Sequence, residues 1–136
     1  MERQDVSAPP AHEFAGEPTS PAAARSFAKK AVAALLAGAV PQSLCDDLEL
    51  VVSELVTNAV RAGSPTIGVT VELVRGRVVV RVSDRAGGWP HERQSRLDDV
   101  GGRGLPLVSA LSAAWGVQLA DDGKVVWAEL DVPSER

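Results

Sequence analysis

The chain has 136 residues, of which 45% are hydrophobic and 24% charged, so it suits one folded domain and is too apolar to be wholly disordered. Its formal net charge of -4 and its lack of any Lys/Arg run argue against nucleic acid and anionic membranes as partners. The single cysteine, Cys45, cannot form an intrachain disulfide, and no apolar run reaches the ~18 residues of a membrane span, so we expect a cytoplasmic protein.

The N-terminal part of the chain predicts a tail followed by a helix. Residues 1–17 combine Pro, Ala and charge without periodicity, which is typical of a flexible tail. The domain is expected over residues 18–132, with a short tail at 133–136. Ser20 is the expected N-cap of the first helix and Gly38 its stop signal. One face of this helix carries an apolar stripe made of Ala24, Phe27, Ala28, Ala31, Val32 and Leu35.

A second helix and a hairpin follow. The helix is expected over residues 41–62 and ends at Gly63. Its stripe consists of Leu48, Val51, Val52, Leu55, Val56 and Ala59. Apolar and polar residues then alternate along residues 66–74 and 77–84, which predicts two antiparallel strands joined by a turn at Arg75-Gly76.

The rest of the chain predicts a long loop, a third helix and a closing hairpin. Residues 85–102 are rich in Gly, Pro and charge, and so long a segment without periodicity favours a lid or binding loop. We expect a helix over residues 105–115 and a hairpin that turns at Asp121-Asp122-Gly123. Because the strands come in adjacent pairs, the order predicts a largely antiparallel α+β sandwich.

Two polar residues of the second helix have two possible interpretations. Glu54 and Asn58 are neighbours at i, i+4 and flank the apolar stripe. They are either the solvated shoulder of an amphipathic helix or part of a binding site. The residues themselves do not decide between the two.

Two glycine-rich segments could complete such a site. In the first, Asp84 ends a predicted strand just before Gly87 and Gly88, where it is either a turn former or a ligand contact. In the second, "GGRGL", the segment 101–105 precedes a predicted helix and is either a hinge or a phosphate cradle. The dinucleotide fingerprint and the P-loop both fit poorly, because Leu107 and Val125 stand where those motifs need other residues.

Together, "ELVTNAV", "DRAGG" and "GGRGL" resemble the three nucleotide-binding boxes of the gyrase, heat-shock chaperone, histidine kinase and MutL (GHKL) ATPase superfamily. With the closing "GKVVWAEL", the chain is most similar to the anti-sigma factor serine kinases over residues 20–131. The resemblance implies the Bergerat ATP-binding fold, a two-layer α+β sandwich of a mostly antiparallel mixed sheet with helices on one face. It also implies ATP and Mg²⁺ as cofactors.

The resemblance assigns roles to individual residues. Asn58 would bind Mg²⁺, and Glu54 would be the general base for a serine hydroxyl or water. Asp84 would accept the exocyclic amine of adenine. The remaining contacts to the nucleotide would come from Gly88, Gly102, Arg103, Gly104 and Leu105, with residues 89–101 as the lid.

Two positions depart from the family pattern. Ala86 replaces a glycine of the first glycine box, and Lys124-Val125 replaces a threonine at the start of the last strand, so we expect a modest ATP affinity. The implied function is an anti-sigma factor that phosphorylates a serine or threonine of an anti-anti-sigma protein and forms a homodimer. The alternatives are an ATP-binding module that sequesters a regulator without phosphorylation, and the catalytic half of a histidine kinase. The histidine kinase alternative is the weakest, because its phosphoacceptor histidine would lie on a helix, and His12 and His91 lie outside the predicted helices.

Overall fold

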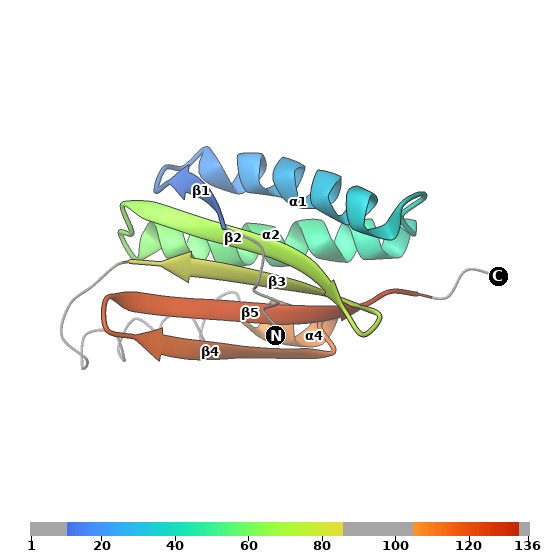
Figure 1. Cartoon of the computed structure of the whole chain (residues 1–136). Helices are drawn as coiled ribbons and strands as arrows, with labels where there is room; N and C mark the ends of the chain where they lie inside the picture. The colour runs from blue at the N-terminus through green and yellow to red at the C-terminus, as the bar shows by residue number, and fades with distance from the viewer. Residues whose placement is uncertain (1–10, 86–104, 134–136) are drawn as a thin grey trace, which may run out of the picture.

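The computed structural model describes residues 11–85 and 105–133, and Figure 1 shows an open sheet with its helices packed on one side. The elements in chain order are β1 (His12–Ala15), α1 (Ser20–Leu36), α2 (Gln42–Arg61), β2 (Thr66–Val74), β3 (Arg77–Asp84), α4 (Leu105–Leu111), β4 (Ala114–Ala120) and β5 (Gly123–Asp131). This arrangement confirms the predicted two-layer α+β sandwich with helices on one face.

The sheet has five strands in the order β1-β2-β3-β5-β4, and each neighbouring pair is antiparallel. Arg75 and Gly76 connect β2 to β3 with φ angles of 53° and 79°, as a type I′ hairpin turn requires at its two central residues. The predicted turn at this place is therefore confirmed. The last strand of the chain, β5, lies between β3 and β4, so it is hydrogen-bonded to a strand some forty residues earlier.

The predicted N-terminal tail is wrong at its C-terminal end, because His12–Ala15 forms strand β1 on the edge of β2. The aromatic ring of His12 stacks on Phe27 of α1 with a centroid distance of 4.6 Å, which holds the strand against the helix. After β1, the amide of Gly16 donates to the carbonyl oxygen of Pro65 at 3.0 Å. A four-residue strand has too little alternation to be recognised in sequence. Residues 1–10 and 134–136, also predicted as tails, lie outside the described residues.

The helices bury their apolar stripes against the sheet, with two deviations from the predicted pattern. In α1, Leu35 is 40% exposed, and Leu36 packs against the core in its place. Ala37, with a φ of 54°, takes the left-handed C-terminal position that we had expected of Gly38. All six predicted stripe residues of α2 are buried, and the stripe starts earlier, at Leu44. Gly63 ends α2 with a φ of 84°, as predicted.

The third helix is shorter than predicted, because α4 ends at Leu111 and Trp115 belongs to β4. The amide of Ala113 donates to the carbonyl oxygen of Glu129 at 2.8 Å, so pairing with β5 has already begun at that residue. The side chains of Trp115 and Val117 point to one face of the sheet and pack against the core. Non-local strand pairing thus overrides a local sequence pattern that suits a helix. The predicted turn at residues 121–123 is confirmed, since Ala120 pairs with Gly123.

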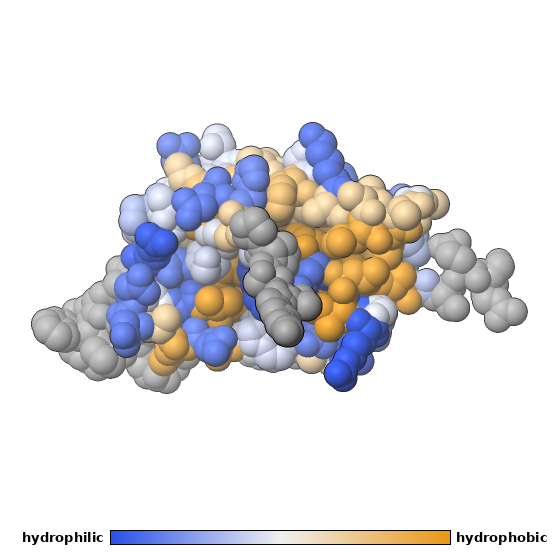
Figure 2. Space-filling view, viewed as in Figure 1, coloured by the Kyte–Doolittle hydropathy of each residue, from blue (hydrophilic) through white to orange (hydrophobic). Residues whose placement is uncertain are grey.

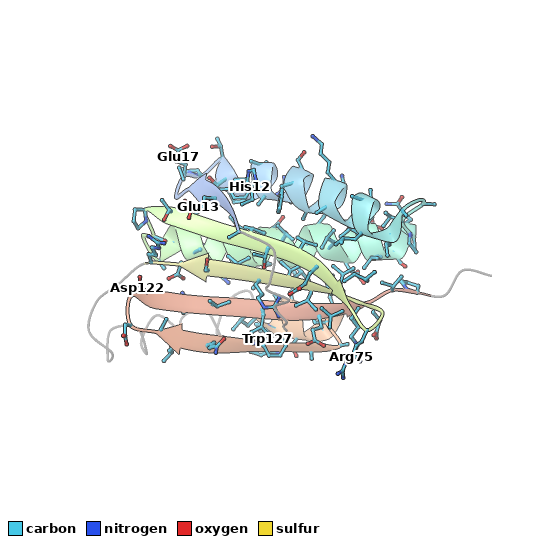
Figure 3. All side chains as sticks on the ribbon, viewed as in Figure 1. His12, Glu13, Glu17, Arg75, Asp122 and Trp127 are labelled. Atoms are coloured by element: carbon cyan, nitrogen blue, oxygen red, sulfur yellow. The ribbon has the colours of Figure 1, made fainter. Side chains whose placement is uncertain are left out.

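No helix of the described residues covers the other face of the sheet. This face is seen from the front in Figures 1 and 2, where polar and apolar side chains both reach the surface. Arg81 forms an ion pair with Glu72 on this face, and the ring of Trp127 lies over Gly116. Figure 3 shows Arg75 and Asp122 in turns at opposite ends of the sheet. Within the described ranges, none of the helices combines the length and hydropathy that a membrane crossing needs.

Candidate functional site

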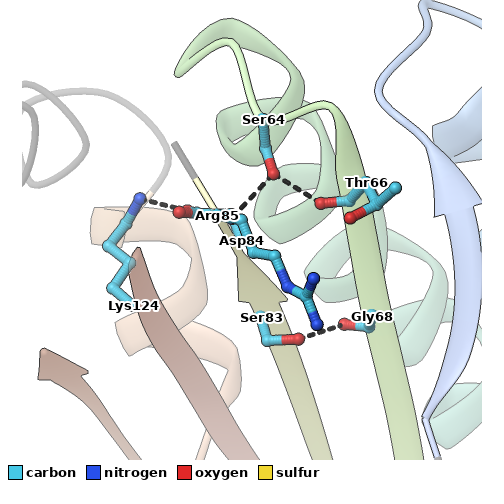
Figure 4. Close-up of polar contacts among 7 residues, drawn as sticks. All are labelled: Ser64, Thr66, Gly68, Ser83, Asp84, Arg85 and Lys124. Atoms are coloured by element: carbon cyan, nitrogen blue, oxygen red, sulfur yellow. Dashed lines mark hydrogen bonds and ion pairs between the residues drawn. The ribbon is translucent and has the colours of Figure 1, made fainter. Parts of the chain in front are cut away.

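Two of the described site residues, Asn58 and Asp84, lie toward one end of the sheet, where α2 ends, β3 ends and β5 begins. Helix α2 leads through Gly63 and Ser64 into β2, and the first core residue of β2, Ile67, pairs with Asp84 at the end of β3. The backbone amide of Arg85 donates to Ser64 Oγ at 2.8 Å, which ties the segment after α2 to the end of β3 (Figure 4). Residues from three separate parts of the chain therefore share this end.

Asn58 is a buried residue of α2 and does not belong to a solvated shoulder. It is 4% exposed, and its side-chain Nδ2 atom has no hydrogen-bond partner among the described residues. Leaving a buried amide unsatisfied costs about 1–3 kcal/mol, and such an orphan in a native fold calls for an explanation. A ligand atom that accepts a hydrogen bond from Nδ2, such as a phosphate oxygen, would provide one. The oxygen of the same amide is one of the hard ligands that Mg²⁺ prefers.

Glu54 lies one helical turn before Asn58 and is half-buried. Its carboxylate forms no hydrogen bond or ion pair with another residue in the ranges 11–85 and 105–133. An unpaired carboxylate that still reaches solvent is able to accept a proton from a substrate hydroxyl. The structure thus places Glu54 and Asn58 on the same part of α2, with Asn58 inside the fold and Glu54 at its border.

Asp84 is paired with Lys124, a residue that was not predicted to belong to the site. Its Oδ2 accepts a hydrogen bond from the Nζ of Lys124, the cross-strand partner on β5 (Figure 4). The exposed fractions of the two side chains are only 4% for Asp84 and 5% for Lys124. A carboxylate at this depth would be costly without a counter-charge, and Lys124 provides it.

Sequence reasoning recognised Lys124 only as a departure from the family pattern. The predicted hairpin places this residue at the start of the last strand, but its neighbour across the sheet depends on strand order. No local signal in the sequence says that β5 lies beside β3. The buried ion pair was therefore missed, because the residue spacing within one segment does not show which strands pair.

Gly123 brings the start of β5 very close to the end of β3. A Cβ atom at this position would lie 1.8 Å from the carbonyl oxygen of Asp84 and 3.0 Å from the Cα of Arg85. Only glycine allows such an approach of two backbones. The glycine that was predicted as a turn residue therefore also sets the position of Lys124 relative to Asp84.

The second glycine box is described only at its last residue, Leu105. This residue begins α4, is 4% exposed and belongs to the hydrophobic core, where α4 packs against α2. Its side chain therefore anchors the start of α4, and any contact with a ligand would come from its backbone. The other predicted contacts, Gly88, Gly102, Arg103 and Gly104, lie outside the described residues, as do Ala86 and the predicted lid.

The residues at this end of the sheet fit a purine nucleotide with Mg²⁺. The buried Asp84 carboxylate is an acceptor for an exocyclic amine. Asn58 Nδ2, which has no partner among the described residues, suits a phosphate oxygen, and the oxygen of the same amide suits a metal. Within the described ranges, no three His, Cys, Asp or Glu residues are grouped as a metal site. A magnesium ion here would accordingly take most of its ligands from phosphates and water, as it usually does.

Comparison with known proteins identifies the family of the chain. No curated protein matches the chain. One family model matches residues 14–130, which include every element from the middle of β1 almost to the end of β5, and its description is the histidine kinase-like ATPase domain. An ATPase domain of this kind implies ATP binding, and the match supports the resemblance to the GHKL superfamily. The chain therefore belongs to the histidine kinase-like ATPase domain family.

Proposed function

We propose that the protein is an anti-sigma factor that acts in the cytoplasm and uses ATP to phosphorylate a serine or threonine of an anti-anti-sigma protein. One observation carries the proposal: within a histidine kinase-like ATPase domain, α2 presents a half-buried Glu54 one turn from a buried Asn58, and neither the Glu54 carboxylate nor Asn58 Nδ2 has a partner in residues 11–85 and 105–133. A proton acceptor beside a metal-binding amide is what phosphoryl transfer to a hydroxyl requires.

Each of the described site residues would have a separate role in the reaction. Mg²⁺, when bound, would neutralise charge on the phosphates, and Asn58 would hold it through its amide oxygen. Glu54 would orient the attacking hydroxyl and take its proton while the new oxygen–phosphorus bond forms and ADP leaves. Asp84 would accept the exocyclic amine of the base. Gly88, Gly102, Arg103, Gly104 and the backbone of Leu105 would line the phosphates, by resemblance to the family.

Transfer of labelled phosphate from ATP to the antagonist protein tests the proposal. The Glu54→Gln variant keeps the shape of the side chain and loses the base, so we expect the transfer rate to fall by about 10²- to 10⁴-fold. Nucleotide affinity should change little, because phosphoryl transfer relies on the base only in the transition state. Glu49→Gln is the matched control on the same helix, since Glu49 pairs with Lys29 on the surface. Full transfer by Glu54→Gln would contradict the role of Glu54.

The ion pair at Asp84 favours a second candidate, an ATP-binding module that sequesters a regulator without phosphorylating it. Because Lys124 already engages Asp84 Oδ2, the carboxylate is a weaker acceptor for a ligand amine than an unpaired one. Calorimetry distinguishes the two candidates. Binding of Mg-ATP in the absence of any transfer would support the module, whereas transfer to the antagonist would support the kinase.

The partners follow from the same proposal. A sigma factor and the anti-anti-sigma protein would compete for the domain, and two copies would dimerise through the uncovered face of the sheet, by analogy with the family. A pull-down from the native cell with and without Mg-ATP would identify the partner and show whether nucleotide selects it. A monomer mass in sedimentation at micromolar concentration would contradict the homodimer.

A further inference from the structure

The ammonium group of Lys124 is buried and only partly used. Its side chain is 5% exposed. Among the described residues, it makes one hydrogen bond, to Asp84 Oδ2. An ammonium has three N–H donors, so two are left without a protein acceptor in this part of the chain. Burying unsatisfied donors is costly, and groups of this kind normally find a partner.

The position of Lys124 indicates what kind of partner fits. Lys124 and Asp84 are directly opposite each other on β5 and β3, and both point to the helix-covered face at the end of the sheet. The amide of Asn58 is buried on the helix that covers this face. The donor, Lys124, and the acceptor, Asp84, therefore lie side by side at the edge of the candidate nucleotide site.

This order of donor and acceptor matches one edge of adenine. On that edge, the ring nitrogen N1 accepts a hydrogen bond and the adjacent exocyclic amine donates one. A protonated amine that donates to N1 would use one of the two spare N–H groups, while the neighbouring carboxylate accepts from the exocyclic amine. Charge-assisted hydrogen bonds of this kind are stronger than neutral ones.

We propose that Lys124 is a base-recognition residue that donates directly to N1 of adenine while it holds Asp84 in place. The proposal rests on the proposed nucleotide-binding function and adds a residue to it. It also gives Gly123 a role, because the close approach of the β5 backbone to the carbonyl oxygen of Asp84 brings the lysine to this position. Lys124 thus contributes both to the counter-charge for Asp84 and to the choice of base.

Titration calorimetry with ADP and 1-deaza-ADP tests the proposal on the full chain. ADP has no γ-phosphate, so phosphoryl transfer does not complicate the measurement, and the deaza analogue replaces N1 by a CH group that cannot accept. We expect the wild-type protein to bind ADP about 10- to 100-fold more tightly than 1-deaza-ADP, the range for a hydrogen bond to a charged group. The 7-deaza analogue keeps N1 and serves as the ligand control, with a loss of roughly threefold or less.

The same two ligands are then compared on a variant without the lysine, which gives a double-mutant-type cycle of protein and ligand changes. In Lys124→Met the preference for ADP over 1-deaza-ADP should fall to about threefold or less, because no donor faces N1. Lys29→Met is the matched control on α1, where the same change removes an exposed ammonium, and it should keep the wild-type ratio. If Lys124→Met does not fold by circular dichroism, Lys124→Thr replaces it, and the comparison of ligands on the wild type needs neither variant.

The outcomes separate this inference from the function on which it rests. Tight binding of ADP with equal affinity for 1-deaza-ADP would overturn the role of Lys124 and leave ATP binding intact. The same is true if the wild-type ratio persists in the folded Lys124 variants. Failure of the wild-type protein to bind ADP at millimolar concentration would overturn the inference and the proposed function together.

Discussion

Removing the ammonium of Lys124 should destabilise the protein strongly. The Lys124→Met substitution keeps a long, unbranched side chain but leaves the Asp84 carboxylate, which is 4% exposed, without its counter-charge. Breaking a buried ion pair from one side costs about 3–5 kcal/mol. This is a large share of the roughly 5–15 kcal/mol by which a domain is stable. For a chain of this length, we expect the melting temperature to fall by roughly 10–20 °C.

Thermal and urea unfolding, followed by circular dichroism, measure this loss. The Lys29→Met variant removes an ammonium from the exposed pair between α1 and α2, whose side chains are 44% and 36% exposed. It should change the stability little, because solvent screens such pairs. The hydrogen bond and the charge of Glu49 raise the pKa of Lys29, so even this small contribution should be present at neutral pH and be lost only in strong alkali, as the pH rises through that raised pKa.

A double variant distinguishes loss of the charge balance from loss of packing. Asp84→Leu together with Lys124→Met replaces both charges by apolar groups, and such replacements are often neutral or stabilising. We expect the double variant to recover most of the stability that Lys124→Met loses. A loss below about 1 kcal/mol in Lys124→Met would show that the Asp84 carboxylate does not depend on Lys124, since a desolvated carboxylate that loses its counter-charge costs more than this. No recovery in the double variant would show that the loss in Lys124→Met does not come from the uncompensated Asp84 carboxylate.

Two further substitutions test the geometry of the site. Gly123→Ala places a Cβ 1.8 Å from the carbonyl oxygen of Asp84, so the backbones must separate and we expect a loss of about 2–3 kcal/mol in urea unfolding. Gly38→Ala, where the nearest atom is 4.0 Å away, is its control, and equal stability of the two variants would contradict the close approach. Asn58→Leu removes a buried amide whose Nδ2 has no partner in the described part of the chain, so the nucleotide-free protein should gain about 1 kcal/mol. The rise in melting temperature on addition of Mg-ADP should disappear in this variant. A nucleotide-induced rise that persists in Asn58→Leu would exclude Asn58 from the site.

Much of the fold could be predicted from local patterns. The apolar stripe of α2, at a spacing of three and four residues, is buried as the helical period requires. Alternation along β2 and β3 identified the buried face of each strand, and Arg75-Gly76 forms the hairpin that joins them. These features depend on neighbours within one or two turns of the chain, which is why a single sequence reveals them.

The prediction failed where a segment pairs with a distant one. Trp115 suits the end of a helix locally, yet β4 begins before it because β5 offers hydrogen bonds from Ala113 onward. Strand β1 forms because residues 12–15 pair with the edge of β2 and because the ring of His12 stacks on Phe27. In both cases non-local hydrogen bonds and contacts outweigh weak local preferences.

In the candidate site too, local patterns could be predicted from the sequence and contacts between distant segments could not. Local spacing identified the candidates for a nucleotide site, because Glu54 and Asn58 share one helical face and the glycine boxes follow in the family's order. Only the three-dimensional arrangement shows that Asn58 is buried, that its Nδ2 has no partner among the described residues, and that Lys124 neutralises Asp84. The physical reason is that burial and charge pairing depend on strand order, which places β5 beside β3 and lets Gly123 approach the backbone of Asp84.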